Sequence, residues 1–455
     1  MAKVAVFIDH DITVRHFLLS GVVPALEADH EVVYVFPESH RRVSTDTATL
    51  PIGRCRTIPV PEARLHRYRR LYHAAVLMRM RHSSDKGPVF RFWRQVLGRR
   101  AFAVSWLFSW PLTHEWYRHR ILGEIGENQA LSQLLAEEKA DIIVHPTVLE
   151  GLFVADLIRW SEPQGVPTVY LMNSWDNPAV KAVTVGSPTR LVVWGDHSRH
   201  LAHERLGIPL DRLVSFGAAQ FDVYRGPPRE APTVYRRRFG VGPETRLLLY
   251  AGSSKGLNET QHLVRLEHAI ERGELPNCVV LYRPHPWRGE ADGERDFLSL
   301  SWKHVRMAPD MVEYYRRRMR GSNVIYLADY AETHATLSAV DAVISPLSTI
   351  LLEAAMHGKP IAAYLPDEDM RTNVALSTIA KTVHFREFFQ RVDCLMCERP
   401  EDLVADCQRL LERAAEPGIA QRLVQQCAFF VTPQPRSYAD QLRLLVDELL
   451  SRRSA

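Results

Sequence analysis

The sequence predicts an α/β protein made of two doubly wound parallel-sheet domains, and three observations support this prediction. Short apolar segments, typical of buried parallel strands, alternate along the chain with segments of helical periodicity. Polar residues directly follow several of these strands, as they do at the carboxyl edge of a doubly wound sheet. Prolines at positions 227, 228 and 232 mark a linker between two such series. We therefore expect one domain over residues 1–226, a second over 240–433, and a C-terminal helix over 434–455 that packs back across the junction.

Length and composition fit a two-domain enzyme. With 455 residues, 46% of them hydrophobic and 24% charged, the chain can form two cores, each in a domain of roughly 200 residues. The net charge of +4 gives no general reason to expect nucleic acid as a partner. No hydrophobic leader precedes the first strand, no apolar run approaches the ~18 residues of a membrane span, and the six cysteines form no disulfide framework. We therefore expect a cytoplasmic protein, or one held peripherally on the inner face of the membrane.

The first strand, Lys3 to Ile8, ends in Asp9-His10-Asp11. Side chains at this position lie at the carboxyl edge of the sheet, so Asp9, His10 and Asp11 are candidates for acceptor contact or for general-base catalysis. The alternative, which we weigh equally, is that they cap the helix that follows.

Residues 62–125 interrupt the alternation of strands and helices and form an expected helical insertion that is basic and rich in aromatic residues. Between Arg64 and Arg100 there are ten arginines and one lysine against a single acid, Asp85. This composition favours an anionic membrane surface or a phosphate-bearing acceptor as the partner. The alternative is a solvated basic helix face beside a cluster of core aromatics. Single-stranded nucleic acid is bound by the same residue types.

Two more strands of the first half end in polar residues. The strand from Ala140 to Val144 leads to His145 and Glu150, and the strand from Thr168 to Met172 leads to the sequence NSWDN. Asp176 is the acid that we expect to act as general base or to contact the acceptor. Glu150, and His10 after the first strand, are the next candidates. The other acceptor contacts expected from these loops are His145, Asn173 and Trp175.

In the second half, the strand from Arg246 to Ala251 is followed by a loop with glycines, hydroxyls and a cation, which suit a phosphate: Gly252, Ser253, Ser254 and Lys255. The spacing is not that of a P-loop. The next strand ends in Arg283-Pro-His285-Pro, where the arginine presents a planar donor fork and the histidine a titratable ring. The alternative for His285 is a buried, hydrogen-bonded ring in a proline turn.

The stretch from Asp341 to Asp367 predicts a strand, a loop, a mostly buried helix and a second strand. Ser348 or Thr349 can cap the helix, whose free N–H groups suit a phosphate. Glu353 lies one turn further on and is not part of a capping box, because Leu351 and Leu352 occupy the positions that a capping acid would need. We expect it to accept hydrogen bonds from ribose hydroxyls, and the alternative is an ion pair with Lys359 or with another cation at the rim.

This stretch resembles the donor-binding segment of GT-B glycosyltransferases. Its ending, KPIAAYLPDED, resembles the corresponding segment of CDP-glycerol glycerophosphotransferases, and the R-x-H-P pattern resembles the phosphate-contacting loop of glycerophosphotransferase-like and polysialyltransferase-like enzymes. SWDN resembles a segment of glycosyltransferase-like surface-carbohydrate proteins. The resemblance implies a GT-B architecture, in which two Rossmann-like domains face each other across a cleft. It also implies donor contacts in the second domain, namely Arg283, His285, Tyr330, Ser345, Ser348, Thr349 and Glu353 together with the residue 252–255 loop.

The implied function is transfer of a glycosyl or polyol-phosphate group from a nucleotide-activated donor to a saccharide or lipid-linked acceptor in cell-surface polysaccharide (capsule) synthesis. His285 would bind the donor phosphate or protonate the leaving group. Arg283, His285 and the helix N-terminus could take the electrostatic role of a metal, so we expect neither a metal nor another cofactor. The alternatives are a non-hydrolysing nucleotide-sugar 2-epimerase and a catalytically silent nucleotide-sugar binding module. The donor base stays open among CDP, UDP and CMP.

Overall fold

The structure is a computed structural model that describes residues 1–38, 43, 45–181, 184–253, 258–285, 297–320 and 329–454. The chain divides into two compact units: unit 1 contains residues 1–222 and 429–455, and unit 2 contains residues 223–428. Ser254 and Lys255, two of the expected donor contacts, lie outside the described residues.

Unit 1 is built on a seven-stranded parallel sheet with the order β3-β2-β1-β4-β5-β6-β7. The strand bounds are β1 Lys3–Phe7, β2 Glu31–Pro37, β3 Arg54–Ile58, β4 Ile142–Thr147, β5 Thr168–Met172, β6 Arg190–Val193 and β7 Leu213–Ser215. The strand order reverses direction between β1 and β4. The loops after these two strands therefore diverge there and leave a crevice at the carboxyl edge, the position where doubly wound sheets bind ligands.

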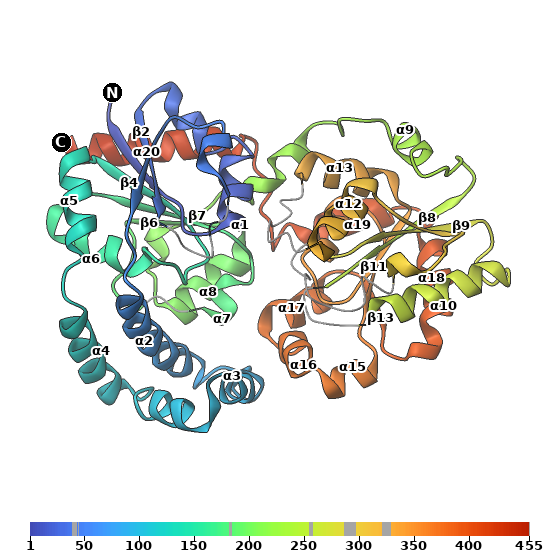
Figure 1. Cartoon of the computed structure of the whole chain (residues 1–455), viewed down its shortest axis with the longest axis horizontal. Coiled ribbons are helices and arrows are strands. Elements are labelled where there is room, and N and C mark those ends of the chain that lie inside the picture. Colours follow the sequence, from blue (N-terminus) through green and yellow to red (C-terminus); the bar gives the residue numbers. More distant parts are fainter. Residues whose placement is uncertain are drawn as a thin grey trace. The chain divides into compact units, whose positions relative to one another are not determined.

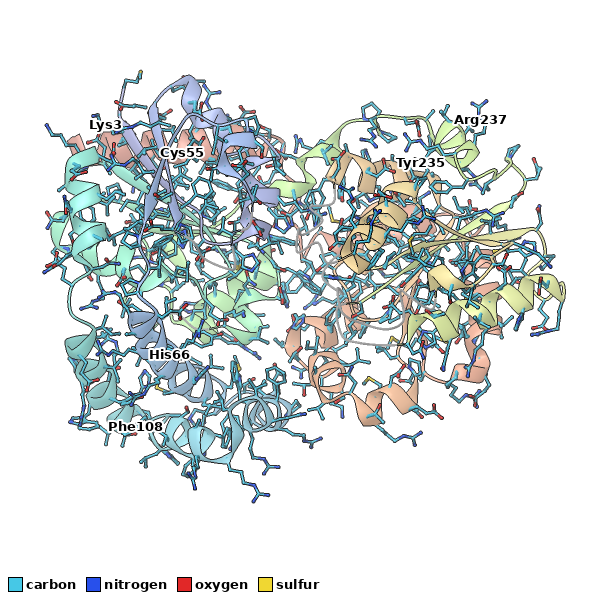
Figure 2. All side chains as sticks on the ribbon, in the orientation of Figure 1. Lys3, Cys55, His66, Phe108, Tyr235 and Arg237 are labelled. Atoms are coloured by element: carbon cyan, nitrogen blue, oxygen red, sulfur yellow. The ribbon has the colours of Figure 1, made fainter. Side chains whose placement is uncertain are left out.

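Helices cover this sheet and extend beyond it. Their bounds are α1 Asp11–Thr13, α2 Glu62–Met80, α3 Lys86–Leu107, α4 Pro111–Ile125, α5 Gln129–Glu138, α6 Val154–Gln164, α7 Asn177–Val180, α8 Asp196–Leu206 and α20 Tyr438–Ser454. Helices α2, α3 and α4 form the insertion, and α2 packs against both of the others (Figure 1). Phe108, labelled in Figure 2, stacks on Tyr117 with ring centroids 4.1 Å apart, which joins the end of α3 to the middle of α4.

Helix α20 returns to unit 1 after the chain has passed through unit 2. Figure 1 shows this red helix among the blue and green elements of the first half. The Tyr438 ring lies against Phe17 and Phe216, with centroid distances of 6.2 and 5.5 Å. Arg443 forms an ion pair with Asp29 at 2.5 Å. The helix is therefore part of the unit 1 fold.

Unit 2 contains a six-stranded parallel sheet with the order β10-β9-β8-β11-β12-β13, and its direction reverses between β8 and β11. The strand bounds are β8 Arg246–Ala251, β9 Cys278–Arg283, β10 Val305–Met307, β11 Ala342–Ser345, β12 Ile361–Tyr364 and β13 Cys394–Cys397. The helices are α9 Pro232–Arg237, α10 Glu259–Glu271, α12 Pro309–Met319, α13 Tyr330–Ala339, α14 Ile350–Met356, α15 Asp367–Thr372, α16 Val374–Ala380, α17 Val383–Arg391, α18 Leu403–Arg413 and α19 Ile419–Cys427.

Both sheets confirm the predicted fold class, two Rossmann-like doubly wound units. The predicted strand, helix and strand between Asp341 and Asp367 are present as β11, α14 and β12. Among the helices that the structure describes, none is long and apolar enough to cross a membrane.

Candidate functional site

In unit 2, the loops after β8 and β11 are joined across the point where the strand order reverses. Ser253, two residues past the end of β8, donates a hydrogen bond from its hydroxyl to the carbonyl of Leu347 at 3.3 Å. Both residues are buried. The two loops are thus held together at the crevice where a doubly wound sheet binds its ligand.

A buried carboxylate that the sequence did not single out organises the first of these loops. Glu259 accepts hydrogen bonds from the Ser253 amide and from the Tyr282 hydroxyl, each at 2.8 Å. A Cβ atom on Gly252 would lie only 2.3 Å from a Glu259 carboxylate oxygen. Gly252 is therefore required for packing against Glu259, whereas the sequence suggested that it lets the backbone approach a phosphate. The sequence signal that could have identified Glu259 is an acid in the first turn of a helix whose inner face is apolar.

Arg283 ends β9 and lies beside this loop. Its Nη2 atom donates to the Thr333 hydroxyl at 2.8 Å, and its carbonyl accepts a 2.8 Å hydrogen bond from the Gly252 amide. Its Nη1 atom is buried, and no group in the described part of the chain accepts a hydrogen bond from it. A guanidinium with an unsatisfied donor at a sheet edge suits an anion such as a phosphate. His285, half-buried two residues further on, accepts a hydrogen bond from Tyr315 on its carbonyl at 3.0 Å.

Glu353 is buried and is contacted by a tyrosine that the sequence did not single out. The Tyr224 hydroxyl donates to the Glu353 carboxylate at 2.6 Å. Burial, and then the charge of Glu353, raise the pKa of Tyr224 well above its usual value, so the phenol keeps its proton and acts as the donor. Lys359, the alternative partner that the sequence offered, donates instead to the carbonyl of Ser338 at 3.2 Å.

The remaining expected donor contacts lie at the same edge of the sheet. Ser345 ends β11, and its hydroxyl is buried with no hydrogen-bond partner among the described residues. Ser348 and the N-cap residue Thr349 are half-buried at the start of α14. Tyr330 begins α13 and lies close enough to Tyr224 to raise the pKa of that phenol. Arg283 lowers the same pKa. The structure thus brings Arg283, Tyr330 and Glu353 together around Tyr224.

In unit 1, Asp9 links the loop after β1 to the loop after β4, at the point where the strand order reverses. Its Oδ2 atom accepts a 2.9 Å hydrogen bond from the Leu152 amide and lies 3.8 Å from Nε2 of His145. His145 donates from Nδ1 to the carbonyl of Phe7 at 2.8 Å. Burial lowers the pKa of His145, so the ring is neutral. The second carboxylate oxygen of Asp9 is buried without a partner in the described part of unit 1, so Asp9 is shielded from bulk solvent.

His10 caps a helix, as the alternative interpretation proposed. Its Nδ1 atom accepts a 3.1 Å hydrogen bond from the amide of Ile12 in the first turn of α1. In the neutral ring the proton is then on Nε2, which is a donor. This geometry does not suit a general base.

The other expected acceptor contacts divide into buried and accessible residues. Trp175 is buried between His197 and Phe430, with centroid distances of 5.7 and 5.4 Å, so it belongs to the core of unit 1. Asn173 is also buried, and its carbonyl contacts a ring nitrogen of His16 at 3.3 Å. Asp176 is half-buried at the N-cap of α7. Asp176 is thus the acid of this loop that a solute can reach.

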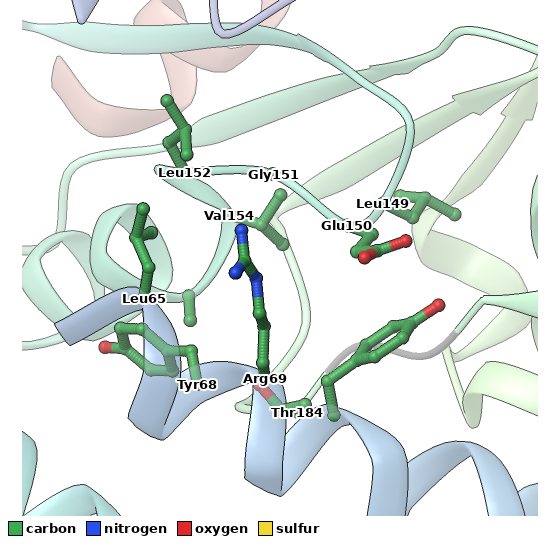
Figure 3. A pocket seen from close by; sticks show the side chains of 11 residues that line it. Leu65, Tyr68, Arg69, Leu149, Glu150, Gly151, Leu152, Val154 and Thr184 are labelled. Atoms are coloured by element: carbon green, nitrogen blue, oxygen red, sulfur yellow. The ribbon is translucent and has the colours of Figure 1, made fainter. Parts of the chain in front are cut away.

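Glu150 lines a pocket between α2 and the loop that follows β4. It pairs with Lys181 at 2.7 Å. Figure 3 shows the Arg69 side chain extending from α2 toward Gly151 in that loop. Within the described residues, the Arg69 guanidinium has no ion-pair partner. The pocket is lined by Leu65, Tyr68, Arg69, Tyr72, Leu149, Glu150, Gly151, Leu152, Val154, Ala155 and Thr184.

The described residues contain no group of three or more histidine, cysteine, aspartate or glutamate side chains that could hold a metal ion.

The chain thus contains two doubly wound units, each with polar groups at its reversal point, as proteins of the GT-B fold do. No protein-family model matches the sequence, and no curated protein matches it either. Among solved structures, the chain is similar to a candidate UDP-N-acetylglucosamine 2-epimerase from Listeria monocytogenes (TM-score 0.53, 11% identity, covering 99% of this chain and 97% of that chain). It is also similar to S. aureus MnaA in complex with UDP (TM-score 0.50, 10% identity, covering 99% and 97%) and to the wall teichoic acid polymerase TagF (TM-score 0.50, 9% identity, covering 99% and 90%). At these identities the likeness confirms the expected GT-B fold.

Proposed function

We propose that this chain is a transferase that moves a glycosyl or polyol-phosphate group from a nucleotide-activated donor to a saccharide or lipid-linked acceptor in cell-surface polysaccharide synthesis. The observation that carries the proposal is the pair formed by Arg283 and Glu353 around Tyr224 in unit 2. Arg283 presents a buried donor that has no partner among the described residues, and Glu353 presents a buried carboxylate. A guanidinium suits a diphosphate, and a carboxylate suits the hydroxyls of a ribose.

On the donor side, Arg283 would contact the pyrophosphate and Glu353 would accept from the ribose hydroxyls. His285 and the hydroxyls of Ser345 and Ser348 would complete the phosphate contacts. We further propose that no metal is needed, because a guanidinium and neutral donors can stabilise the charge that develops on the leaving diphosphate.

On the acceptor side, we propose Asp176 as the general base. His10 presents a donor nitrogen, and Asp9 is shielded, whereas Asp176 is half-buried and reachable. The pocket beside Glu150 offers apolar and aromatic walls for a sugar ring or polyol, and Arg69 offers a cation for a phosphate on the acceptor.

We propose that a lipid-linked acceptor is reached through the far end of the insertion, around residues 91–116. Leu112 is 90% exposed and Trp116 is 56% exposed. Further exposed apolar residues of this surface are Val96, Val104, Trp106, Leu107 and Trp110. Exposed arginines lie beside them at positions 91, 94, 99 and 100. Aromatic and aliphatic side chains next to arginines suit the surface of an anionic bilayer.

The expected region was residues 64–100, and the structure shifts the proposed surface toward the C-terminal end of the insertion. Arg64 forms a buried ion pair with Asp156 at 2.7 Å. Arg81 is buried, donates to the Ser109 hydroxyl at 2.5 Å and lies over the Trp110 ring at 3.7 Å from its centroid. These arginines are used within unit 1, so they are not part of the proposed membrane surface.

The test is a thermal-shift screen of the purified protein with CMP, CDP, UDP, GDP and ADP, each with and without EDTA, followed by donor turnover with acceptor. A stabilising shift with a pyrimidine nucleotide that persists in EDTA supports the donor site and its independence of metal. No shift with any nucleotide would refute the proposed donor site. A shift that EDTA abolishes would refute only the metal-free part.

A second candidate function is a non-hydrolysing nucleotide-sugar 2-epimerase, which the similarity to a candidate UDP-N-acetylglucosamine 2-epimerase favours. An epimerase converts its nucleotide sugar without any acceptor, whereas a transferase releases nucleotide only when acceptor is present. Nucleotide binding without turnover of any donor would favour a third possibility, a silent binding module.

A further inference from the structure

Two histidines that the sequence did not single out form a hydrogen-bonded chain next to Glu353. Nε2 of His334 lies 3.0 Å from the carbonyl oxygen of Gly226, and its Nδ1 lies 2.8 Å from Nε2 of His357. Nδ1 of His357 in turn lies 2.7 Å from the carbonyl oxygen of Glu353. These hydrogen bonds thus connect Gly226, which precedes α9, to α14, the helix that carries the proposed ribose-binding acid Glu353.

A count of the ring protons shows that two neutral histidines cannot form all three of these hydrogen bonds. A carbonyl oxygen only accepts hydrogen bonds, so Nε2 of His334 and Nδ1 of His357 must each carry a proton. A neutral imidazole has one proton, so the two inner nitrogens would then face each other with lone pairs at 2.8 Å. One additional proton turns this contact into a hydrogen bond. The pair therefore carries one positive charge.

Burial and neighbouring side chains define the surroundings of the pair. Burial, as the main cause, lowers the pKa of His357 to about 4, so that ring is neutral. The centroid of the Tyr224 ring lies 5.1 Å from that of His334 and 4.5 Å from that of His357. The Ser338 hydroxyl is 3.5 Å from Nδ1 of His334, at the limit of a hydrogen bond, whereas His357 is at 2.8 Å.

The charged and titratable groups around the pair come from several elements. Glu353, on α14, is a carboxylate, and Lys359, in the turn after α14, is a cation whose charge lowers the pKa of His357. Tyr224 packs against both rings. Its own pKa is raised by Tyr330 and lowered by Arg283. The additional proton of the pair would supply positive charge beside α14, whose Glu353 carbonyl contacts His357.

We propose that the His334–His357 pair is a positioning element that holds one additional proton and thereby fixes Glu353 for nucleotide binding. The positioning role rests on the proposed function. When the proton is lost at higher pH, the contact between the inner nitrogens becomes repulsive, and His357 releases the carbonyl of Glu353. Nucleotide affinity should then fall as pH rises.

The first arm of the test does not depend on nucleotide. The free energy of unfolding of unit 2 is measured from pH 7 to pH 9 for the wild type, for His357→Gln and for the exposed control His268→Gln. A glutamine amide can donate to a neutral His334, so the substitution removes the need for the additional proton. The folded wild type binds more protons than the unfolded chain, so its stability should fall with rising pH relative to His357→Gln. Parallel curves for these two proteins would overturn the proposal, and His268→Gln should follow the wild type.

The second arm measures the affinity for the nucleotide that stabilises the protein best, over the same pH range. The wild type should lose up to about tenfold in affinity per pH unit once the proton is released, and His357→Gln should show a flat profile. Equal profiles together with a difference in stability would refute the positioning role while confirming the proton. Absence of nucleotide binding in every protein would refute the proposed function, and the stability arm would still decide whether the pair carries the proton.

Discussion

The Tyr224 hydroxyl donates a 2.6 Å hydrogen bond to the Glu353 carboxylate, and it joins two parts of unit 2 that are 129 residues apart in the sequence. Tyr224 belongs to the short helical segment Ala219–Arg225, whereas Glu353 lies on α14. A buried carboxylate needs such a donor, because burying an unpaired charge is costly. The tyrosine contacts one of the two carboxylate oxygens, and the carboxylate is the proposed acceptor for a ribose hydroxyl.

If Glu353 binds the ribose, Glu353→Gln should weaken nucleotide binding by about 1 to 3 kcal/mol, the usual loss for a hydrogen bond to a charged group. The amide oxygen can still accept from Tyr224, so the thermal midpoint without ligand should change little. Isothermal titration and thermal unfolding measure the two effects. A collapsed midpoint with unchanged affinity would identify Glu353 as purely structural.

Replacing Arg283 tests the phosphate contact. Arg283→Lys keeps the charge but loses the planar fork. It should therefore weaken the binding of a nucleoside diphosphate more than the binding of a nucleoside without phosphate. The affinity for cytidine or uridine, compared with the corresponding diphosphate, measures this difference. An equal loss for both ligands would contradict a role in binding the diphosphate.

Gly252→Ala should destabilise unit 2 by about 1 to 3 kcal/mol, because the added methyl group meets the buried Glu259 carboxylate and the site has no space for it. Denaturant unfolding measures the loss. Gly242→Ala is the matched control, since a Cβ atom there has a single neighbour at 3.9 Å. Equal stabilities of the two variants would show that Glu259 can move aside.

Acid should destabilise unit 1 through its buried neutral histidines. Burial lowers the pKa of His145, and it lowers that of His16 well below the usual value. Below about pH 6.5 the unfolded rings bind protons that the folded rings do not, so stability falls by up to about 1.4 kcal/mol per pH unit for each histidine. Unfolding followed by the fluorescence of the buried Trp175 and Trp194 reports on this unit. His145→Gln should flatten the pH dependence between pH 7 and pH 5, and His119→Gln, at an exposed site, should not.

The proposed membrane surface predicts that Arg99→Glu with Arg100→Glu reduces binding to vesicles containing anionic lipid, since each lost basic residue contributes about 1 kcal/mol. Leu112→Asp should reduce it through lost apolar contact. Leu444→Asp, on the exposed face of α20, is the control for adding a charge at an apolar site. Co-sedimentation with neutral and anionic vesicles measures the binding. Unchanged binding of the arginine variant would refute the surface.

The sequence was sufficient for the fold because its strands are short, apolar and each followed by polar residues. The segment from Asp341 to Asp367 shows this most clearly, since its strand, helix and second strand all appear as expected. The helix expected after the first strand is less regular, because residues 14–18 form a π-helix and Pro24–Ala28 a 3-10 helix. Hydrogen-bond periodicity of this kind leaves no clear trace in the apolar pattern.

The candidate site was only partly predictable, because several of its groups act through contacts between residues distant in the sequence. The positions of Arg283 and Glu353 followed from the strands and helix that carry them. The roles of Tyr224, Glu259 and His334 did not, since each depends on a partner in another element. Trp175 was expected to contact the acceptor, but it is covered by Phe430, which reaches it only after the chain has passed through unit 2.

The return of α20 to unit 1 has a consequence for the order in which a ribosome delivers the chain. Residues 1–222 leave the ribosome well before residues 429–455, which complete the same unit. At synthesis rates of about 5 to 20 residues per second, the nascent unit waits at least about ten seconds with the surface around Phe17 and Phe216 uncovered. Unit 2 emerges and can fold during that interval, so the half of the protein that is synthesised first is the last to be finished.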